Sequence, residues 1–315
     1  MQPLKNISGI ILFAIFVFAS CNPTKDKWAN RKFHTLTGHY NIYFNGEQKL
    51  LQAIQQIEAT HQNNFNKILD VFPMGTPEAA KSAGNLLDEA IKKFSGAVQL
   101  HTVGSYTDDA YYSLGICRFY KQDYFAAIET YQYIIGRYKD SEFANKSTCW
   151  IARCYVGLEK IGEAEAIMGQ LLAKKDLPKK DIGLIYAAAA EINIQMEKYL
   201  PAIENLKIAL TGKLSKDQKV RYNYILGQLC FQANKKPEAT YYFNKVISSI
   251  PTYDFAFNAN ISLTKIYNST DKRSVAKVRK NLKKMARDDK NLDYLDQIYF
   301  ELGRLNFLKK TCLLP

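Results

Sequence analysis

The sequence is poor in the residue types that build metal and catalytic centres. Its four histidines are scattered, and neither an HExxH nor an HxxxH pairing occurs. No CxxC pair is present, so the spacing typical of a zinc site is missing. Carboxylate pairs such as Asp108-Asp109 fall at expected helix starts, where they complement the helix dipole. We therefore expect no catalytic residue, no metal and no cofactor, and a protein that is not an enzyme.

Long apolar runs are absent after the first twenty residues. Residues 7–18 are almost wholly apolar and follow Lys5, and Ala19-Ser20 leads into Cys21. About a dozen apolar residues are too few to span a bilayer, which favours a signal peptide. The residues before Cys21 resemble a bacterial lipobox, with phenylalanine where leucine is usual at its first place. We expect acylation of Cys21 to anchor the mature chain to a membrane outside the cytoplasm. The alternatives are an ordinary signal sequence, or a transmembrane anchor with a chance cysteine.

Cysteines are few, and those of the mature chain do not suggest a disulfide framework. Besides Cys21 they are Cys117, Cys149, Cys154, Cys230 and Cys312, an odd number. Cys149 and Cys154 lie five apart on one expected helix and point in different directions. Cys117 and Cys154 lie at equivalent places in neighbouring repeats and could meet. We favour the interpretation that these cysteines are small residues of the helix core.

Basic residues outnumber acidic residues, and the excess of positive charge is unevenly distributed along the sequence. The formal charge is +13, and residues 271–290 hold nine Lys or Arg against three Asp. An exported protein is not expected to bind nucleic acid. An anionic membrane surface or an acidic protein face would suit the 271–290 patch, and so would a plain solvated helix face.

What the sequence does have is a fixed period. A small residue is followed twelve positions later by alanine, four times, and the first anchor advances by 37, 38 and 37 residues. The anchor pairs are Gly115 and Ala127, Ala152 and Ala164, Ala190 and Ala202, and Gly227 and Ala239. Such a period is typical of a solenoid of helix pairs, in which small residues let antiparallel helices approach closely.

The repeats resemble the tetratricopeptide pattern of an aromatic, Leu-Gly, Tyr, then Ala and Phe. This resemblance implies an all-α tetratricopeptide-repeat solenoid, a right-handed superhelix of antiparallel helix pairs with an N-terminal helical cap. A fifth copy around Thr264 and Ala276 is degraded, and a sixth begins at Leu302-Gly303 without a second helix, which would leave an apolar face open. The predicted organisation is 1–20 signal peptide, 21–45 tether and aromatic segment, 46–104 N-terminal helical segment, and 105–315 repeat array, with four clear repeats, one degenerate repeat and a last incomplete one.

The concave face of such an array is the expected binding surface. First helices line this face, and positions beside the packed anchors point into it. The predicted partner-binding residues are Asp109, Tyr112, Phe119, Arg153, Glu191, Arg221, Tyr224, Gln228 and Phe231. Aromatics flanked by single charges suit a peptide or helix partner. Packing between helices is the alternative for Phe119 and Phe231.

The most specific text is HYNIYFNG, residues 39–46, preceded by Phe33-His34. It resembles the segment after the lipidated cysteine in the SprE/PorW family of tetratricopeptide lipoproteins of Bacteroidota. Residues 61–71 and the first repeat also resemble that family, so the similarity runs from Cys21 to about residue 305. The resemblance implies an outer-membrane lipoprotein that faces the periplasm and serves type IX protein secretion and gliding motility. Its expected partners are other proteins of that complex and the membrane, with no small-molecule substrate.

Two other functions fit an anchor plus repeats. A glycan-binding lipoprotein of the SusD kind would need an exposed aromatic platform on long insertions, and the inter-repeat loops here are short. A lipoprotein accessory of outer-membrane β-barrel assembly shares the anchor and the repeats, but it lacks the HYNIYFNG text. We therefore favour a lipid-anchored protein–protein interaction scaffold.

Overall fold

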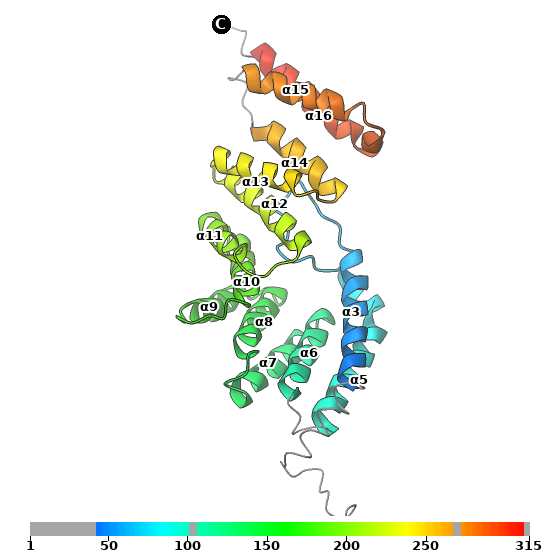
Figure 1. Ribbon diagram of the computed structural model, residues 1–315, viewed down its shortest axis with the longest axis vertical. Coiled ribbons are helices and arrows are strands. Elements are labelled where there is room, and N and C mark those ends of the chain that lie inside the picture. The colour runs from blue at the N-terminus through cyan, green and yellow to red at the C-terminus, as the bar shows by residue number, and fades with distance from the viewer. Residues whose placement is uncertain (1–41, 101–105, 267–271, 312–315) are drawn as a thin grey trace, which may run out of the picture. The chain divides into compact units, whose positions relative to one another are not determined.

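The computed structural model describes residues 42–100, 106–266 and 272–311. Every regular element in those ranges is a helix, which confirms the all-α fold class (Figure 1). The predicted signal peptide, Cys21 and most of the HYNIYFNG text lie outside the described residues. None of the described helices is long and apolar enough to cross a membrane.

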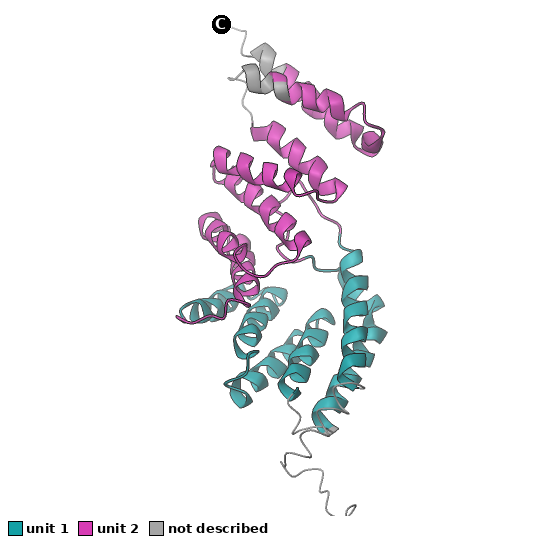
Figure 2. Cartoon of the chain, in the orientation of Figure 1, with its two compact units in different colours: residues 1–61, 73–173 teal, residues 62–72, 174–315 magenta. Residues whose placement is uncertain are grey.

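The chain divides into two compact units (Figure 2). Unit 1 comprises residues 1–61 and 73–173, and unit 2 comprises residues 62–72 and 174–315. The helices of unit 1 are α3 (Phe44–Ala59), α4 (Pro77–Ser82), α5 (Gly84–Leu100), α6 (Thr107–Tyr120), α7 (Tyr124–Arg137), α8 (Ala144–Gly157) and α9 (Ile161–Leu172). Those of unit 2 are α10 (Ile182–Gln195), α11 (Tyr199–Ala209), α12 (Lys216–Gln232), α13 (Lys236–Ser248), α14 (Tyr253–Ile266), α15 (Lys272–Met285), the short 3-10 helix η2 (Asp289–Tyr294) and α16 (Leu295–Thr311).

The tetratricopeptide anchors lie at the closest approaches between paired helices. A Cβ atom on Gly115 of α6 would stand 2.5 Å from the ring of Tyr131 on α7. The equivalent atom on Gly227 of α12 would stand 2.8 Å from the ring of Phe243 on α13. The alanines twelve residues after the four anchors are all fully buried. These contacts confirm that α6–α7, α8–α9, α10–α11 and α12–α13 are the predicted helix pairs.

The N-terminal helices form a pair of the same kind. Gly46 of α3 faces Phe94 of α5, and a Cβ atom on Gly46 would stand 2.9 Å from that ring. Phe94 lies four residues after the buried Ala90, as Tyr131 lies four after Ala127. Within the predicted helical segment 46–104, residues 77–100 form two helices, because Ala83 closes α4 before α5 begins. Gly46 and Ala90 are 44 residues apart rather than twelve, so this pair has a long insertion between its helices.

The turn inside each clear repeat recurs with the same backbone geometry. Gln122, Glu159, Glu197 and Asn234 have φ between 57° and 64°, and they follow one another at 37, 38 and 37 residues. At each turn two amides donate back to the preceding helix, as Glu159 N does to Val156 O and Lys160 N to Tyr155 O. This is the Schellman arrangement, which satisfies the last carbonyls of a helix and reverses the chain.

The degraded fifth copy is also helical. Val278 and Leu282 of α15 are buried with Phe257 and Ile261 of α14 and with residues of α16. Thr264 does not face a second-helix alanine. Its hydroxyl instead donates to the buried carboxylate of Glu301 on α16 over 3.3 Å. Gly303 of α16 is the small anchor residue of the sixth repeat. A Cβ atom at this position would meet no atom within 4 Å, so no second helix packs against it in the described residues.

Candidate interaction surface

The predicted groove residues all lie on first helices of the repeats, as their spacing requires. Those of α6 and α8 belong to unit 1, and those of α10 and α12 belong to unit 2. Their exposure differs widely. Phe119 and Tyr224 are 1% and 0% exposed and act as packing residues, whereas Phe231 is 38% exposed. Asp109, Tyr112, Glu191 and Gln228 are half-buried.

In unit 1, Arg153 is a buried cation among aromatic rings. Its guanidinium lies 4.3 Å from the ring centroid of Trp150 and 4.9 Å from that of Phe119. Its Nη2 also lies 3.8 Å from the sulfur of Met74, in the connection between α3 and α5. Cation–π attraction grows when the cation is desolvated, so these rings stabilise a charge that is only 4% exposed.

Tyr112 is held by Trp150 of α8 and by Phe143, the residue just before that helix. Its hydroxyl accepts a hydrogen bond from Trp150 Nε1 at 2.8 Å, and its ring stacks on Phe143 with centroids 4.6 Å apart. Nearby on α6, burial and the charge of Asp108 raise the pKa of Asp109 above its ordinary value. This part of α6 is therefore a preformed polar and aromatic surface rather than a set of free side chains.

In unit 2, Arg221 and Gln228 of α12 form hydrogen bonds with a segment that lies about 160 residues earlier in the sequence. We call residues 62–72 the inserted segment; it follows α3 in the chain but packs with unit 2. Arg221 donates to Asp70 O at 3.0 Å and to Asn63 Oδ1 at 2.8 Å. Gln228 donates to Lys67 O at 2.6 Å and accepts from Leu69 N at 3.0 Å.

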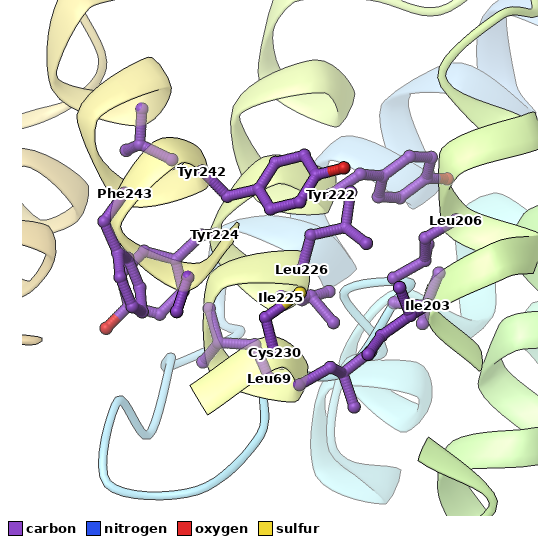
Figure 3. Packing of buried hydrophobic residues seen from close by; sticks show 14 of the residues in the cluster. Leu69, Ile203, Leu206, Tyr222, Tyr224, Ile225, Leu226, Cys230, Tyr242 and Phe243 are labelled. Carbon is purple, nitrogen blue, oxygen red and sulfur yellow. The ribbon is translucent and has the colours of Figure 1, made fainter. Parts of the chain in front are cut away.

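Apolar side chains complete the same contact. The ring of Phe65 meets Tyr224 of α12 and Phe255 of α14 edge-on, with centroids 5.3 Å and 5.4 Å apart. Leu69 and Val71 are 3% and 2% exposed and belong to the core cluster of unit 2. Figure 3 shows Leu69 among the buried side chains of that cluster.

A cavity of about 810 Å³ lies beside the inserted segment. Its lining includes Asn66 of the segment, Phe231 of α12, Lys265 of α14 and Phe300 of α16. Phe300 is 70% exposed, so two aromatic side chains of this cavity reach solvent. Phe231 is thus the one groove residue of α12 that remains substantially exposed.

The inserted segment and its ring contacts were missed by the sequence reasoning. The signal available was weak. Within the segment, residues 68–72 are apolar except for Asp70, and Gly46 stands 44 residues before Ala90 where a plain repeat needs twelve. Neither feature identifies the helix that the segment meets, because α12 lies about 160 residues further along the chain.

The described residues hold few reactive groups. Cys117, Cys149, Cys154 and Cys230 are buried thiols, and burial raises the pKa of the Cys154 thiol to about 12. Such thiols pack as small apolar residues and are poor nucleophiles. Among the described residues, no three His, Cys, Asp or Glu side chains gather as metal ligands would.

Comparison with known proteins finds distantly similar structures and no family. No protein-family model and no curated protein matches the sequence. Among solved structures, the TPR2AB domain of yeast Sti1 in complex with an Hsp90 peptide is 16% identical, with a TM-score of 0.30, and the match covers 72% of this chain and 98% of that one. The Naa15/Naa10 complex bound to HypK is 12% identical, with a TM-score of 0.41 and 90% and 43% coverage. The assignment of the fold rests on the helix pairs described above.

Proposed function

We propose that this protein is a lipid-anchored scaffold that binds other proteins of a type IX secretion and gliding machinery at the periplasmic face of the outer membrane. The observation that carries this proposal is the HYNIYFNG text, together with the lipobox-like residues before Cys21 and the helix pairs that follow. Acylation at Cys21 would place the repeats at a membrane surface, and repeats of this kind offer extended surfaces to partners.

The described end of the HYNIYFNG text has a structural role that fits such a scaffold. Tyr43 is 7% exposed, and its ring lies 5.5 Å from that of Phe94 and 6.0 Å from that of Tyr106. Gly46 lets α3 approach α5 closely. The text therefore starts the first helix pair a short distance after the proposed lipid anchor, which would bring the repeats close to the membrane.

The chemistry of the surface supports binding rather than catalysis. The groove residues that reach solvent are aromatic, amide or singly charged side chains, which are typical of peptide recognition. Burial raises the pKa of the Cys154 thiol to about 12, which makes it a poor nucleophile.

The test is co-purification of the full-length protein from membranes solubilised in mild detergent. We expect components of the type IX secretion ring to be recovered with it. Recovery of a polysaccharide transporter instead would overturn the proposal in favour of glycan uptake. Recovery of β-barrel assembly proteins would assign the third role.

The anchor has its own test. Radiolabelled palmitate should enter the wild-type chain, and Cys21→Ser should lose the label and most of its membrane association, because one residue carries the acyl chains. The variant Cys312→Ser is the matched control and should label like the wild type. Equal labelling of Cys21→Ser and the wild type would refute the lipidated anchor.

A further inference from the structure

The inserted segment is bound much as a peptide ligand would be. It has no helix or strand of its own: a turn at residues 64–67 is followed by irregular chain and by a bend at Val71 and Phe72. Its partners come from one face of α12, at positions 221, 224 and 228, and from Phe255 of α14. Those positions are three and four residues apart, so they lie on one stripe of the helix.

Most of the polar recognition is directed at the main chain of the segment. Gln228 bridges Lys67 O and Leu69 N with the two ends of one amide, and Arg221 binds Asp70 O. Main-chain groups are common to every sequence, so these contacts hold an irregular peptide without reading its side chains. Of the three residues whose main chain is bound, Lys67 and Asp70 keep their side chains exposed.

Specificity comes from one aromatic and two aliphatic side chains of the inserted segment. Phe65 inserts between two rings, and Leu69, four residues later, is buried in the core, followed by Val71. Asn63 adds one side-chain contact, through its amide oxygen, to Arg221. The site therefore selects a peptide with an aromatic residue, an aliphatic residue four positions on and a second aliphatic residue two positions later, in the irregular conformation of the inserted segment.

We propose that the concave site formed by α12 and α14 is a peptide-binding site that the inserted segment occupies as an intramolecular ligand, and that it opens to bind a segment of the same pattern from a partner protein. This inference rests on the proposed role as a protein-binding scaffold and names the chemistry of one partner. The inserted segment then weakens binding of the partner. The partner's apparent dissociation constant equals its intrinsic value divided by the fraction of molecules whose site is open.

The probe is a fluorescent peptide with the sequence of residues 61–74, followed by anisotropy against the full-length chain. We expect weak binding to the wild type. In the variant Phe65→Ala/Leu69→Ala the intramolecular ligand has lost both anchors, and the peptide should bind at least about tenfold more tightly. Adding Gln228→Ala to that variant should abolish the gain, since both main-chain hydrogen bonds of Gln228 are removed.

The matched controls use residues held only through their main chain. A probe with Lys67→Ala and Asp70→Ala should bind like the native probe, and one with Phe65→Ala and Leu69→Ala should not bind. A folded Phe65→Ala/Leu69→Ala protein that binds the native probe no better than the wild type overturns the proposal. A dimer of that variant, detected by light scattering, would assign the freed site to a second copy and also overturn it.

A second measurement covers the case in which the variant fails to fold. In the wild type, hydrogen exchange of the Leu69 amide reports opening of the segment, because its bond partner is the side chain of Gln228. We expect this amide to exchange at least about a hundredfold faster than that of Leu226 within α12, through local opening. Equal rates would mean that the segment leaves only on unfolding of the whole unit, and would overturn the proposal.

The experiments distinguish failure of the proposed function from failure of the proposed peptide-binding site. Peptide exchange without recovery of secretion proteins overturns the assigned machinery and supports the site. Recovery of those proteins without peptide exchange supports the machinery and overturns the site.

Discussion

At the scale of single residues, the anchors of the repeats match the size of what they face. Gly115 and Gly227 face the rings of Tyr131 and Phe243, sixteen residues later. Where the anchor is alanine, the residue sixteen positions later is aliphatic: Met168 follows Ala152, and Leu206 follows Ala190. A methyl group on the anchor and a ring on the partner do not fit together at this helix separation.

This complementarity predicts a coupled pair. We expect Gly227→Ala to lower the free energy of unfolding by about 1–3 kcal/mol, because the new Cβ atom would stand 2.8 Å from the Phe243 ring. In the background of Phe243→Leu, which reproduces the pair Ala190 and Leu206, the same change should have a much smaller effect. Urea denaturation of the four proteins measures the coupling energy, and strictly additive effects would contradict this account.

At the scale of elements, the helix pairs could be predicted because their signal is local. A period of 37 or 38 residues and an offset of twelve fix where helices begin and approach one another. The inserted segment could not be predicted in this way, because its contacts lie about 160 residues away and leave no period. The predicted groove residues lie on the first helices of their pairs, but Phe119 and Tyr224 are buried, and the contact of α12 with the inserted segment was not predicted.

The turns within the pairs give a second prediction. Glu159 has φ of 60°, a conformation that an ordinary side chain adopts at a penalty of about 1–2 kcal/mol. We expect Glu159→Gly to raise the free energy of unfolding by about 0.5–1 kcal/mol, since part of that gain is offset by the freer unfolded chain. Asn234→Gly is the matched control with φ of 57°, and it should gain less because asparagine tolerates this region. Thermal unfolding that ranks the two variants in the opposite order would refute the argument.

At the scale of the whole molecule, we expect a substitution in the inserted segment to change the stability of unit 2 and to leave that of unit 1 unchanged. Leu69→Ala removes a side chain buried in unit 2 and should destabilise that unit by about 2–5 kcal/mol. Amides of α12 and α13 should then exchange faster with solvent, while those of α6 and α7 in unit 1 keep their rates. Leu200→Ala, at a position that is 55% exposed on α11, should change little. Faster exchange in both units would contradict the assignment of the segment to unit 2 alone.

The inserted segment also restricts the order in which the parts of the chain can fold. A ribosome makes residues 62–72 first and α12 about 160 residues later, a wait of roughly ten to thirty seconds at ordinary rates of translation. Simple solenoids grow from neighbour to neighbour and need no such delay. Here Leu69 and Val71 cannot reach their places in the core of unit 2 until α12 has been made, so we expect the last step in the folding of that unit to wait for the synthesis of this helix.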